Sequence, residues 1–280
     1  MNGHPLLNVR ALLKRRGHVP RRGLGQNFLE DPAALQSIVA AARLNGDDVV
    51  LEIGCGVGSL TVLLALSAGQ VVAVELDPDL AVMAGEVLAP YRNVRIVRGD
   101  ILAFSPATLG LPSGYVVAAN IPYNLTSPIL RHLLESNPMP QRIVLTVQKE
   151  VAQRVCAVPP HMSVLALSVQ VYGTVELVLE VPATAFYPIP KVDSAVVRIE
   201  THTTPIIAPQ LLPAFFGLVK AGFSQRRKTL RNTFAHGLGI SPDESKVLLA
   251  RAGIDPQRRA ETLSLDEWSL LTTQERSRFS

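Results

Sequence analysis

The chain has 280 residues, of which 48% are hydrophobic, and its formal net charge is +4. This length supplies ample material for one large domain, alone or with a small appendage. Two cysteines are too few for a disulfide scaffold, and no apolar run reaches the ~18 residues of a membrane span. The histidines and cysteines show no metal-ligand spacing. We therefore expect a cytoplasmic monomer without a metal or a membrane segment.

Residues 1–30 are basic, with six Lys or Arg side chains and no acid before Glu30. Apolar spacing over residues 5–16 predicts a short amphipathic helix, and residues 23–29 are typical of a loop. A second basic cluster lies at residues 226–231. Two such clusters in a mildly basic chain suggest contacts with phosphates. A solvated charged face would explain either cluster alone equally well.

From residue 31 onward, strands and helices are expected to alternate. Asp31-Pro32 and Asp77-Pro78 each predict a helix start, with Asp as N-cap and Pro at the first position. Continuous β-branched runs between helical segments indicate a parallel sheet that helices cover on both faces. The expected strands are 49–53, 71–75, 94–97, 115–119 and 143–147.

The last third of the chain changes character. We expect a short helix ending near residue 171, a strand at 175–181 and a final antiparallel strand at 192–199. Ser241 and Ser264 each begin a Ser-x-x-Glu capping box, so residues 207–280 are expected to be helical. The expected organisation is a basic segment at 1–30, an α/β domain at 31–204 and a helical domain at 205–280.

A glycine-rich loop, Gly54-Cys55-Gly56-Val57-Gly58, joins the first strand of the sheet to its helix. Glycines there let a ligand approach the backbone closely. Ser59 stands where a dinucleotide fingerprint needs Gly or Ala, which argues against an NAD-binding enzyme. Cys55 has no base near it in sequence, so a nucleophilic role is not expected.

Three acids, Glu52, Glu75 and Asp100, lie at the carboxyl ends of consecutive strands, where open α/β sheets bind ligands. Glu75 is suited to bind a ribose diol, and Asp100 to accept from an adenine amino group. A pocket this acidic disfavours a pyrophosphate and suits an adenosine that carries positive charge, such as S-adenosylmethionine. Both later acids could instead be helix caps, although Asp77 and Ser105 could serve as those caps.

The stretch Asn120-Ile121-Pro122-Tyr123-Asn124 follows the fourth strand. Its carboxamide and nearby carbonyls can accept hydrogens from an exocyclic amine, and Tyr123 can stack on the ring that carries the amine. Taken alone, the stretch is more typical of a turn with a packed tyrosine.

Several segments together resemble the KsgA/RsmA family of small-subunit rRNA adenine dimethyltransferases, from about residue 10 to the C-terminus. They are 25–29 (GQNFL), 52–58 (EIGCGVG), Glu75, Asp100, 120–124 (NIPYN), 148–151 (QKEV), 186–196 (FYPIPKVDSAV) and 223–232 (FSQRRKTLRN). The resemblance implies a Rossmann-like class I methyltransferase sheet, mostly parallel with one antiparallel strand, plus a small C-terminal helical domain. It implies S-adenosylmethionine as cofactor. The implied substrate is 16S rRNA in the immature small ribosomal subunit, where two adjacent adenosines of the 3′-terminal hairpin loop are each methylated twice on N6. A role in ribosome biogenesis would follow.

The resemblance also assigns site residues. The cofactor would be bound by Gln26, Asn27, Leu29, Glu52, Gly54, Gly56, Glu75, Leu76, Asp100, Ile101 and Asn120. The target base would be held by Asn120, Pro122 and Tyr123, with Phe186 on its far side, for direct in-line methyl transfer without a strong base. The two basic clusters, and not the resemblance, provide the candidates for contacts with RNA phosphates, although Arg226 or Arg227 could instead pair with an acid inside the helical domain. These candidates are Arg21, Arg22, Arg226, Arg227, Lys228 and Arg231.

Two other functions stay open on the sequence. A 23S rRNA adenine methyltransferase of the macrolide-resistance type shares the glycine loop and the Asn-Ile-Pro-Tyr stretch. A non-catalytic RNA-binding assembly factor could use the same fold, although the acids, Asn120 and Tyr123 are all present here. One departure from the family lies at residues 156–162, where its members usually carry a longer loop.

Overall fold

The computed structural model describes residues 7–276, except for the side chains of Arg22 and Arg276. Residues 1–6, with the first two positions of the expected N-terminal helix, lie outside the described part. The chain forms two compact units. The first runs to Ala152 and resumes over Val175–Thr201, and the second comprises Gln153–Thr174 and the chain from His202 onward.

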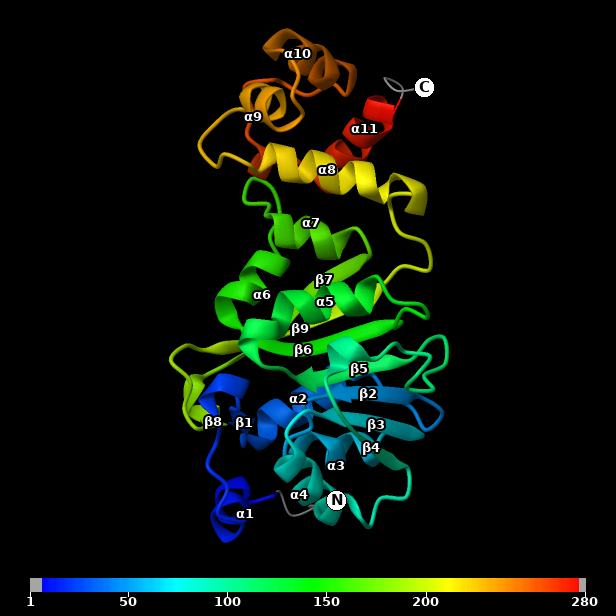
Figure 1. Ribbon diagram of the computed structural model, residues 1–280, viewed down its shortest axis with the longest axis vertical. Helices are drawn as coiled ribbons and strands as arrows, with labels where there is room; N and C mark the ends of the chain where they lie inside the picture. The colour runs from blue at the N-terminus through cyan, green and yellow to red at the C-terminus, as the bar shows by residue number, and fades with distance from the viewer. Residues whose placement is uncertain (1–6, 277–280) are drawn as a thin grey trace. The chain divides into compact units, whose positions relative to one another are not determined.

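A seven-stranded sheet forms the centre of the first unit, in the order β4-β3-β2-β5-β6-β9-β7 (Figure 1). Neighbouring strands from β4 to β6 are parallel, and β9 runs antiparallel to β6. This confirms the predicted Rossmann-like class. The strands are β2 Val49–Ile53, β3 Gln70–Glu75, β4 Val94–Arg98, β5 Val116–Asn120, β6 Arg142–Gln148, β7 Gly173–Val181 and β9 Ser194–Thr201.

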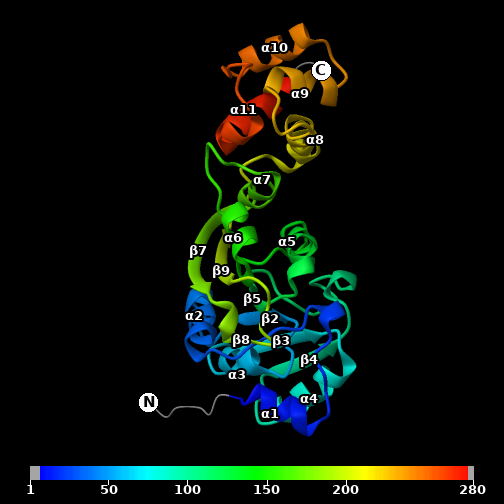
Figure 2. The same cartoon turned by 90° about the vertical axis from the view of Figure 1, so that its left-hand side faces the viewer.

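Helices cover both faces of this sheet, and Figure 2 shows α2 (Pro32–Ala42) and α5 (Thr126–Leu134) on opposite sides of it. One hydrophobic core joins Leu35 and Ile38 of α2 to Val116 and Ala118 of the sheet. Asp31 and Asp77 cap their helices as predicted, accepting from the backbone N–H of Ala34 and of Asp79. The other helices here are α1 Val9–Arg15, α3 Ser59–Ala65, α4 Pro78–Leu88 and α6 Lys149–Val155, which runs into the second unit.

A two-stranded sheet, which the sequence did not predict, joins β1 (Phe28–Leu29) to β8 (Phe186–Tyr187). The two strands are antiparallel, with Phe28 opposite Tyr187 and Leu29 opposite Phe186. This pairing ties the N-terminal segment to the chain that precedes β9.

The second unit is mainly helical in its described residues. Its core contains the fully buried rings of Phe215, Phe234 and Trp268. Both predicted capping boxes are formed, at Ser241 and at Ser264. None of the helices within residues 7–276 combines the length and the apolar content that crossing a membrane would require. The helices are α7 Val164–Gln170, α8 Leu212–Gly222, α9 Leu230–Gly237, α10 Pro242–Arg251 and α11 Leu265–Arg276.

Residues 153–174 were expected in the α/β domain, but they group with the helical unit. Here the Met162 N–H donates to the carbonyl of Glu261 at 2.9 Å, and the His202 N–H donates to the carbonyl of Tyr172 at 2.8 Å. The helix α7 and the strand β7 form where the sequence predicted them, so the difference concerns packing and not secondary structure.

Candidate active site

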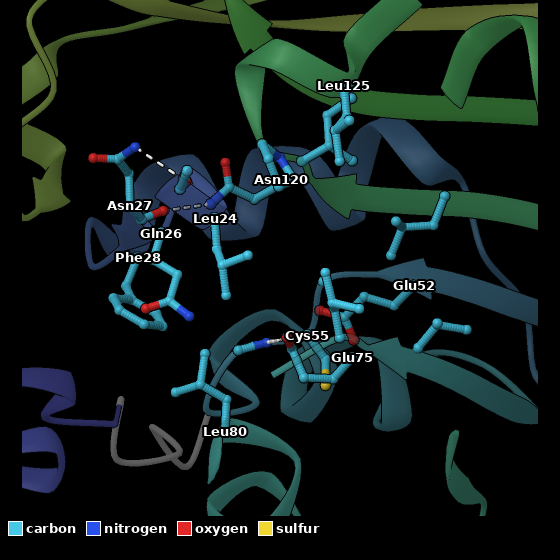
Figure 3. A pocket seen from close by; sticks show the side chains of 18 of the residues that line it. Leu24, Gln26, Asn27, Phe28, Glu52, Cys55, Glu75, Leu80, Asn120 and Leu125 are labelled. Atoms are coloured by element: carbon cyan, nitrogen blue, oxygen red, sulfur yellow. Dashed lines mark hydrogen bonds between the residues drawn. The ribbon is translucent and has the colours of Figure 1, made fainter. Parts of the chain in front are cut away.

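A cavity of about 350 Å³ lies in the first unit, at the carboxyl ends of β2, β3, β4 and β5 (Figure 3). Residues 23–29, the glycine loop and residues 120–125 complete its wall. The structure thus brings together all the predicted cofactor-binding residues and two of the further residues predicted to hold the base. Those that line the cavity are Gln26, Asn27, Leu29, Glu52, Gly54, Gly56, Glu75, Leu76, Asp100, Ile101, Asn120, Pro122 and Tyr123.

The glycine loop needs its glycines for conformation and for space. Gly54, Gly56 and Gly58 have φ angles of +72°, +58° and +93°, in the left-handed region that side chains disfavour. A Cβ on Gly56 would lie 3.1 Å from the ring of Phe28. Larger residues would therefore push the loop away from the N-terminal segment that faces it.

Glu75 holds this loop through a hydrogen bond to its backbone. It is 6% exposed, and its two carboxylate oxygens accept from the backbone N–H of Gly56 at 2.8 Å and of Asp77 at 2.9 Å. Burial raises the pKa of Glu75, and these two hydrogen bonds oppose the rise. Each oxygen retains a lone pair, so the carboxylate can also accept from a ligand hydroxyl.

Glu52 is more isolated. It is 2% exposed, and burial raises its pKa to about 8; the nearby Thr61 hydroxyl opposes this rise, and the charge of Glu75 adds a smaller increase. Its Oε2 atom is buried and has no hydrogen-bond partner within the described residues. A buried carboxyl group normally has partners, so an unpaired one that lines a cavity suits a cationic group of a ligand.

The far end of the cavity has a mixed wall. Asp100 accepts from the Leu102 N–H at 3.0 Å, so it acts as a cap with one oxygen and keeps the other as an acceptor. Ile101 is buried and Leu76 is half-exposed, and both side chains line the cavity. An acceptor beside two apolar side chains can accommodate the amine and the faces of an adenine ring.

Asn120 ends β5 with its carboxamide oriented. Its Nδ2 donates to the main-chain oxygen of Asn27 at 3.0 Å (Figure 3). Only the NH₂ group of an amide can donate, so this bond leaves Oδ1 as the atom that accepts from a ligand. The geometry therefore provides an acceptor suited to an amine.

Tyr123 follows in a tight turn, Tyr123–Leu125, in which the Leu125 N–H donates to the carbonyl of Pro122 at 3.0 Å. The Tyr123 hydroxyl lies 2.6 Å from the Oγ of Ser194. Gly25 packs directly on this turn, since a Cβ on it would lie 2.9 Å from the Cβ of Pro122.

Phe186 is the predicted base-binding residue that the structure does not bring to the cavity. Its ring is fully buried in the core with Leu29 and Val181, and it is absent from the described lining. The cause is the pairing of β8 with β1, which places Phe186 opposite Leu29. The next residue, Tyr187, is half-buried and carries the Arg10 guanidinium 4.8 Å from its ring centroid. Contact between Phe186 and a base would require the ring to leave this packing.

Arg21 is engaged within the protein. Its guanidinium pairs with Asp77 at 3.1 Å and with Asp79 at 2.8 Å. Gln26 bridges the same elements, accepting from the Arg21 N–H at 2.6 Å and donating to Asp77 at 2.8 Å. His18, Asp77 and Asp79 place possible metal ligands within 4.8 Å of one another, but Arg21 and Gln26 already use both acids. These contacts hold the N-terminal segment to the start of α4.

In the second unit, Arg226, Arg227 and Lys228 are exposed between α8 and α9 and form no ion pair with the described residues. Arg231 lies 3.5 Å from Asp243. The side chain of Arg22, also a predicted RNA contact, lies outside the described part.

Some residues of the site were not predicted. Leu24, Phe28, Leu80 and Ile129 line the cavity as apolar side chains, and their sequence pattern is that of ordinary core residues. Ser194 contributes through its hydroxyl, and no short-range spacing links it to Tyr123.

The family model described as "Ribosomal RNA adenine dimethylase" matches residues 17–274. A protein of Dehalococcoides mccartyi named "Ribosomal RNA small subunit methyltransferase A" is 46% identical over 272 residues, covering 96% of this chain and 94% of that protein. A protein of the same name from Moorella thermoacetica is 42% identical over 273 residues, covering 94% of each.

Two solved structures are similar over most of this chain. A dimethyladenosine transferase from Plasmodium falciparum has a TM-score of 0.79 and 26% identity, covering 90% of this chain and 98% of its own. The 23S rRNA methyltransferase ErmE has a TM-score of 0.73 and 28% identity, covering 88% of this chain and 98% of its own.

Proposed function

The chain belongs to the ribosomal RNA adenine dimethylase family, and from this premise we propose that it methylates 16S rRNA in the small ribosomal subunit. It is an S-adenosylmethionine-dependent adenine dimethyltransferase. Its proposed targets are two adjacent adenosines in the 3′-terminal hairpin loop, each methylated twice on N6. The observation that carries this proposal is the Asn120 carboxamide, whose oxygen is left free at the rim of an acidic cavity beside Tyr123.

The cavity fits S-adenosylmethionine, because it combines buried acids with apolar walls. The unpaired Glu52 carboxyl would hold the methionine ammonium group, and Glu75 would accept from the ribose hydroxyls. Asp100 would accept from the adenine amine between Leu76 and Ile101. When bound, the cofactor supplies an electrophilic methyl group on a positively charged sulfur.

The protein's task is to make a poor nucleophile attack, since the N6 lone pair of adenine is delocalised into the ring. Asn120 Oδ1 accepts one hydrogen of the amine. A main-chain carbonyl, that of Ile121 or that of Pro122, would accept the other. The Ile121 carbonyl is the better candidate, because that of Pro122 already accepts from the Leu125 N–H and has one lone pair left. Two acceptors in these positions turn the lone pair out of the ring plane, toward the methyl group.

Tyr123 would stack on the flipped base, an interaction worth ~1–3 kcal/mol. Holding the base and the cofactor in line would supply much of the remaining acceleration, since proximity can contribute about 7–11 kcal/mol. A bound cofactor would supply the methyl group: the N–C bond would form as the S–C bond breaks, and the sulfur would keep that electron pair. The nitrogen then loses a proton to water, so no strong base is needed.

RNA binding is proposed for Arg226, Arg227 and Lys228, which are exposed and unpaired among the described residues. Arg21 is better suited to hold the N-terminal segment over the cofactor, because two acids already bind its guanidinium. We further propose that the protein acts as a monomer on the immature subunit in the cytoplasm, during ribosome biogenesis.

A second candidate target is 23S rRNA, which the similarity to ErmE favours. The test is incubation of labelled S-adenosylmethionine with unmethylated small subunits or with 23S rRNA, followed by mapping of the modified adenosines. We expect label in the 3′-terminal hairpin of 16S rRNA. Label in 23S rRNA alone would favour the second candidate, and label in neither would contradict both.

Asn120→Ala should abolish transfer and leave the cofactor dissociation constant within a few-fold of wild type. The reason is that the substitution removes the acceptor for the amine, whereas the acids of the cofactor pocket remain. Calorimetric titration with S-adenosylhomocysteine measures this constant. Loss of cofactor binding in a folded variant would contradict the role given to Asn120.

A further inference from the structure

We propose that Ser194 is a positioning residue that fixes the ring plane of Tyr123, and that this restraint matters most for the second methyl transfer to each adenosine. This inference rests on the proposed dimethylation. It adds a residue outside the cavity lining and a distinction between the two chemical steps.

Ser194 offers a rigid anchor. It is fully buried at the first position of β9, in register with Gln148 of β6. Its neighbour Asp193 is held on two sides, since its carbonyl accepts from the Lys149 N–H at 3.0 Å and its carboxylate accepts from the Ala183 N–H at 2.9 Å. The backbone that carries Ser194 is therefore held in place next to Tyr123.

Tyr123 is restrained at its backbone and at its far end. Its carbonyl accepts from the Thr126 hydroxyl at 3.1 Å, and its own hydroxyl lies 2.6 Å from Ser194 Oγ. Burial raises the pKa of Tyr123, so the phenol stays neutral and can donate this hydrogen bond. Without it, the ring would keep its place at the cavity but could rotate about its side-chain bonds, which lowers the population that stacks in the reactive orientation.

The two transfers differ in how the amine is held. Adenine brings two N–H hydrogens, one for Asn120 Oδ1 and one for the Ile121 carbonyl. N6-methyladenine brings one, so one acceptor is left without a hydrogen to accept. Orientation of the base in the second transfer therefore depends more on stacking, and a loosened Tyr123 should slow that transfer more than the first.

The test compares wild type with Ser194→Ala, Tyr123→Phe and the double variant on unmethylated small subunits. Digestion and mass spectrometry of the rRNA give N6-methyladenosine and N6,N6-dimethyladenosine against time, from which the two rate constants follow. Ser245→Ala is the matched control, because it also removes a fully buried hydroxyl, in α10.

For Ser194→Ala we expect monomethylated product to accumulate, with the second rate constant falling about tenfold more than the first, the scale of one lost hydrogen bond. Tyr123→Phe should behave alike, and the double variant should lose no more than either single one, because both remove the same bond. Cofactor affinity should stay unchanged, and Ser245→Ala should match wild type. If Ser194→Ala does not fold, Tyr123→Phe makes the same comparison from the other side of the bond.

Equal slowing of both transfers, additive losses in the double variant, or a wild-type product ratio in both single variants would overturn the role of Ser194. A wild-type protein that produces no dimethyladenosine would instead overturn the proposed function, and this inference with it.

Discussion

At the scale of single residues, Glu52 is the side chain whose charge depends most on what fills the cavity. Its pKa of about 8, against an ordinary value of 4.5, means that the free protein holds a proton on this carboxyl at neutral pH. A cation beside the carboxylate favours the ionised form, so the pKa should fall when an ammonium or sulfonium group binds. Binding must then release a proton below pH 8.

This linkage predicts how affinity depends on pH. Between pH 6 and 8 the affinity for S-adenosylmethionine should rise with pH, by up to about tenfold per unit, and level off above pH 8. Calorimetry in buffers of different ionisation enthalpy should record proton release at pH 7. Glu52→Gln should bind more weakly, with much of the pH dependence lost. Wild-type binding without proton release would contradict this account.

Residue types at strand ends could be predicted from the sequence, because a parallel sheet brings the carboxyl ends of its strands to one edge. Glu52, Glu75 and Asn120 meet in the cavity for this reason. The engagement of Arg21 and the burial of Phe186 could not be predicted. Both depend on partners far along the chain, Asp77 for Arg21 and Leu29 for Phe186.

At the scale of elements, local signals located most helices and strands. The Asp-Pro starts of α2 and α4 and the two capping boxes each depend on a few adjacent residues. The pair β1–β8 gave no such signal, since two residues are too few to show a period. The assignment of residues 153–174 to the helical unit could not be predicted either, because their packing partners, such as Glu261, are distant in sequence.

A substitution at Gly25, just before β1, tests whether the N-terminal segment must pack closely against the stretch 120–124 for activity. Gly25→Ala would place a Cβ 2.9 Å from Pro122 at a φ of +65°, so the segment must shift. We expect the unfolding free energy to fall by about 1–2 kcal/mol and activity to fall with it, because Asn27 would move away from Asn120. Thermal unfolding and initial transfer rates measure both effects.

Gly23→Ala is the matched control, since a Cβ there would have no neighbour within 4 Å. Equal effects of the two substitutions would show that close packing at Gly25 does not matter.

At the scale of the whole molecule, the net charge of +4 is small, so its distribution decides where a polyanion binds. Many of the basic side chains in the first unit are paired with acids, as Arg10 is with Glu30 and Arg16 with Glu86. Arg226, Arg227 and Lys228 have no such partner among the described residues.

Replacing Arg226, Arg227 and Lys228 by alanine should weaken binding to small subunits and reduce the slope of log K against log salt by about 2–3 units, or roughly 0.7–0.9 per lost phosphate contact. Filter binding between 50 and 200 mM salt measures the slope. Arg131→Ala is the control, because this exposed side chain is already paired with Glu135. An unchanged slope in the triple variant would remove these residues from the RNA interface.

The hydrogen bond from Asn120 to Asn27 joins residues 93 positions apart, and its consequence concerns fidelity. A carboxamide ends in an oxygen that accepts and an NH₂ group that donates. Rotation by half a turn about the side-chain bond would present the NH₂ group to the base in place of the oxygen. The turned group would favour a base edge that accepts, such as the O6 of guanine. In the proposed base site, the Asn27 carbonyl that holds this NH₂ would therefore keep the enzyme selective for a base that donates.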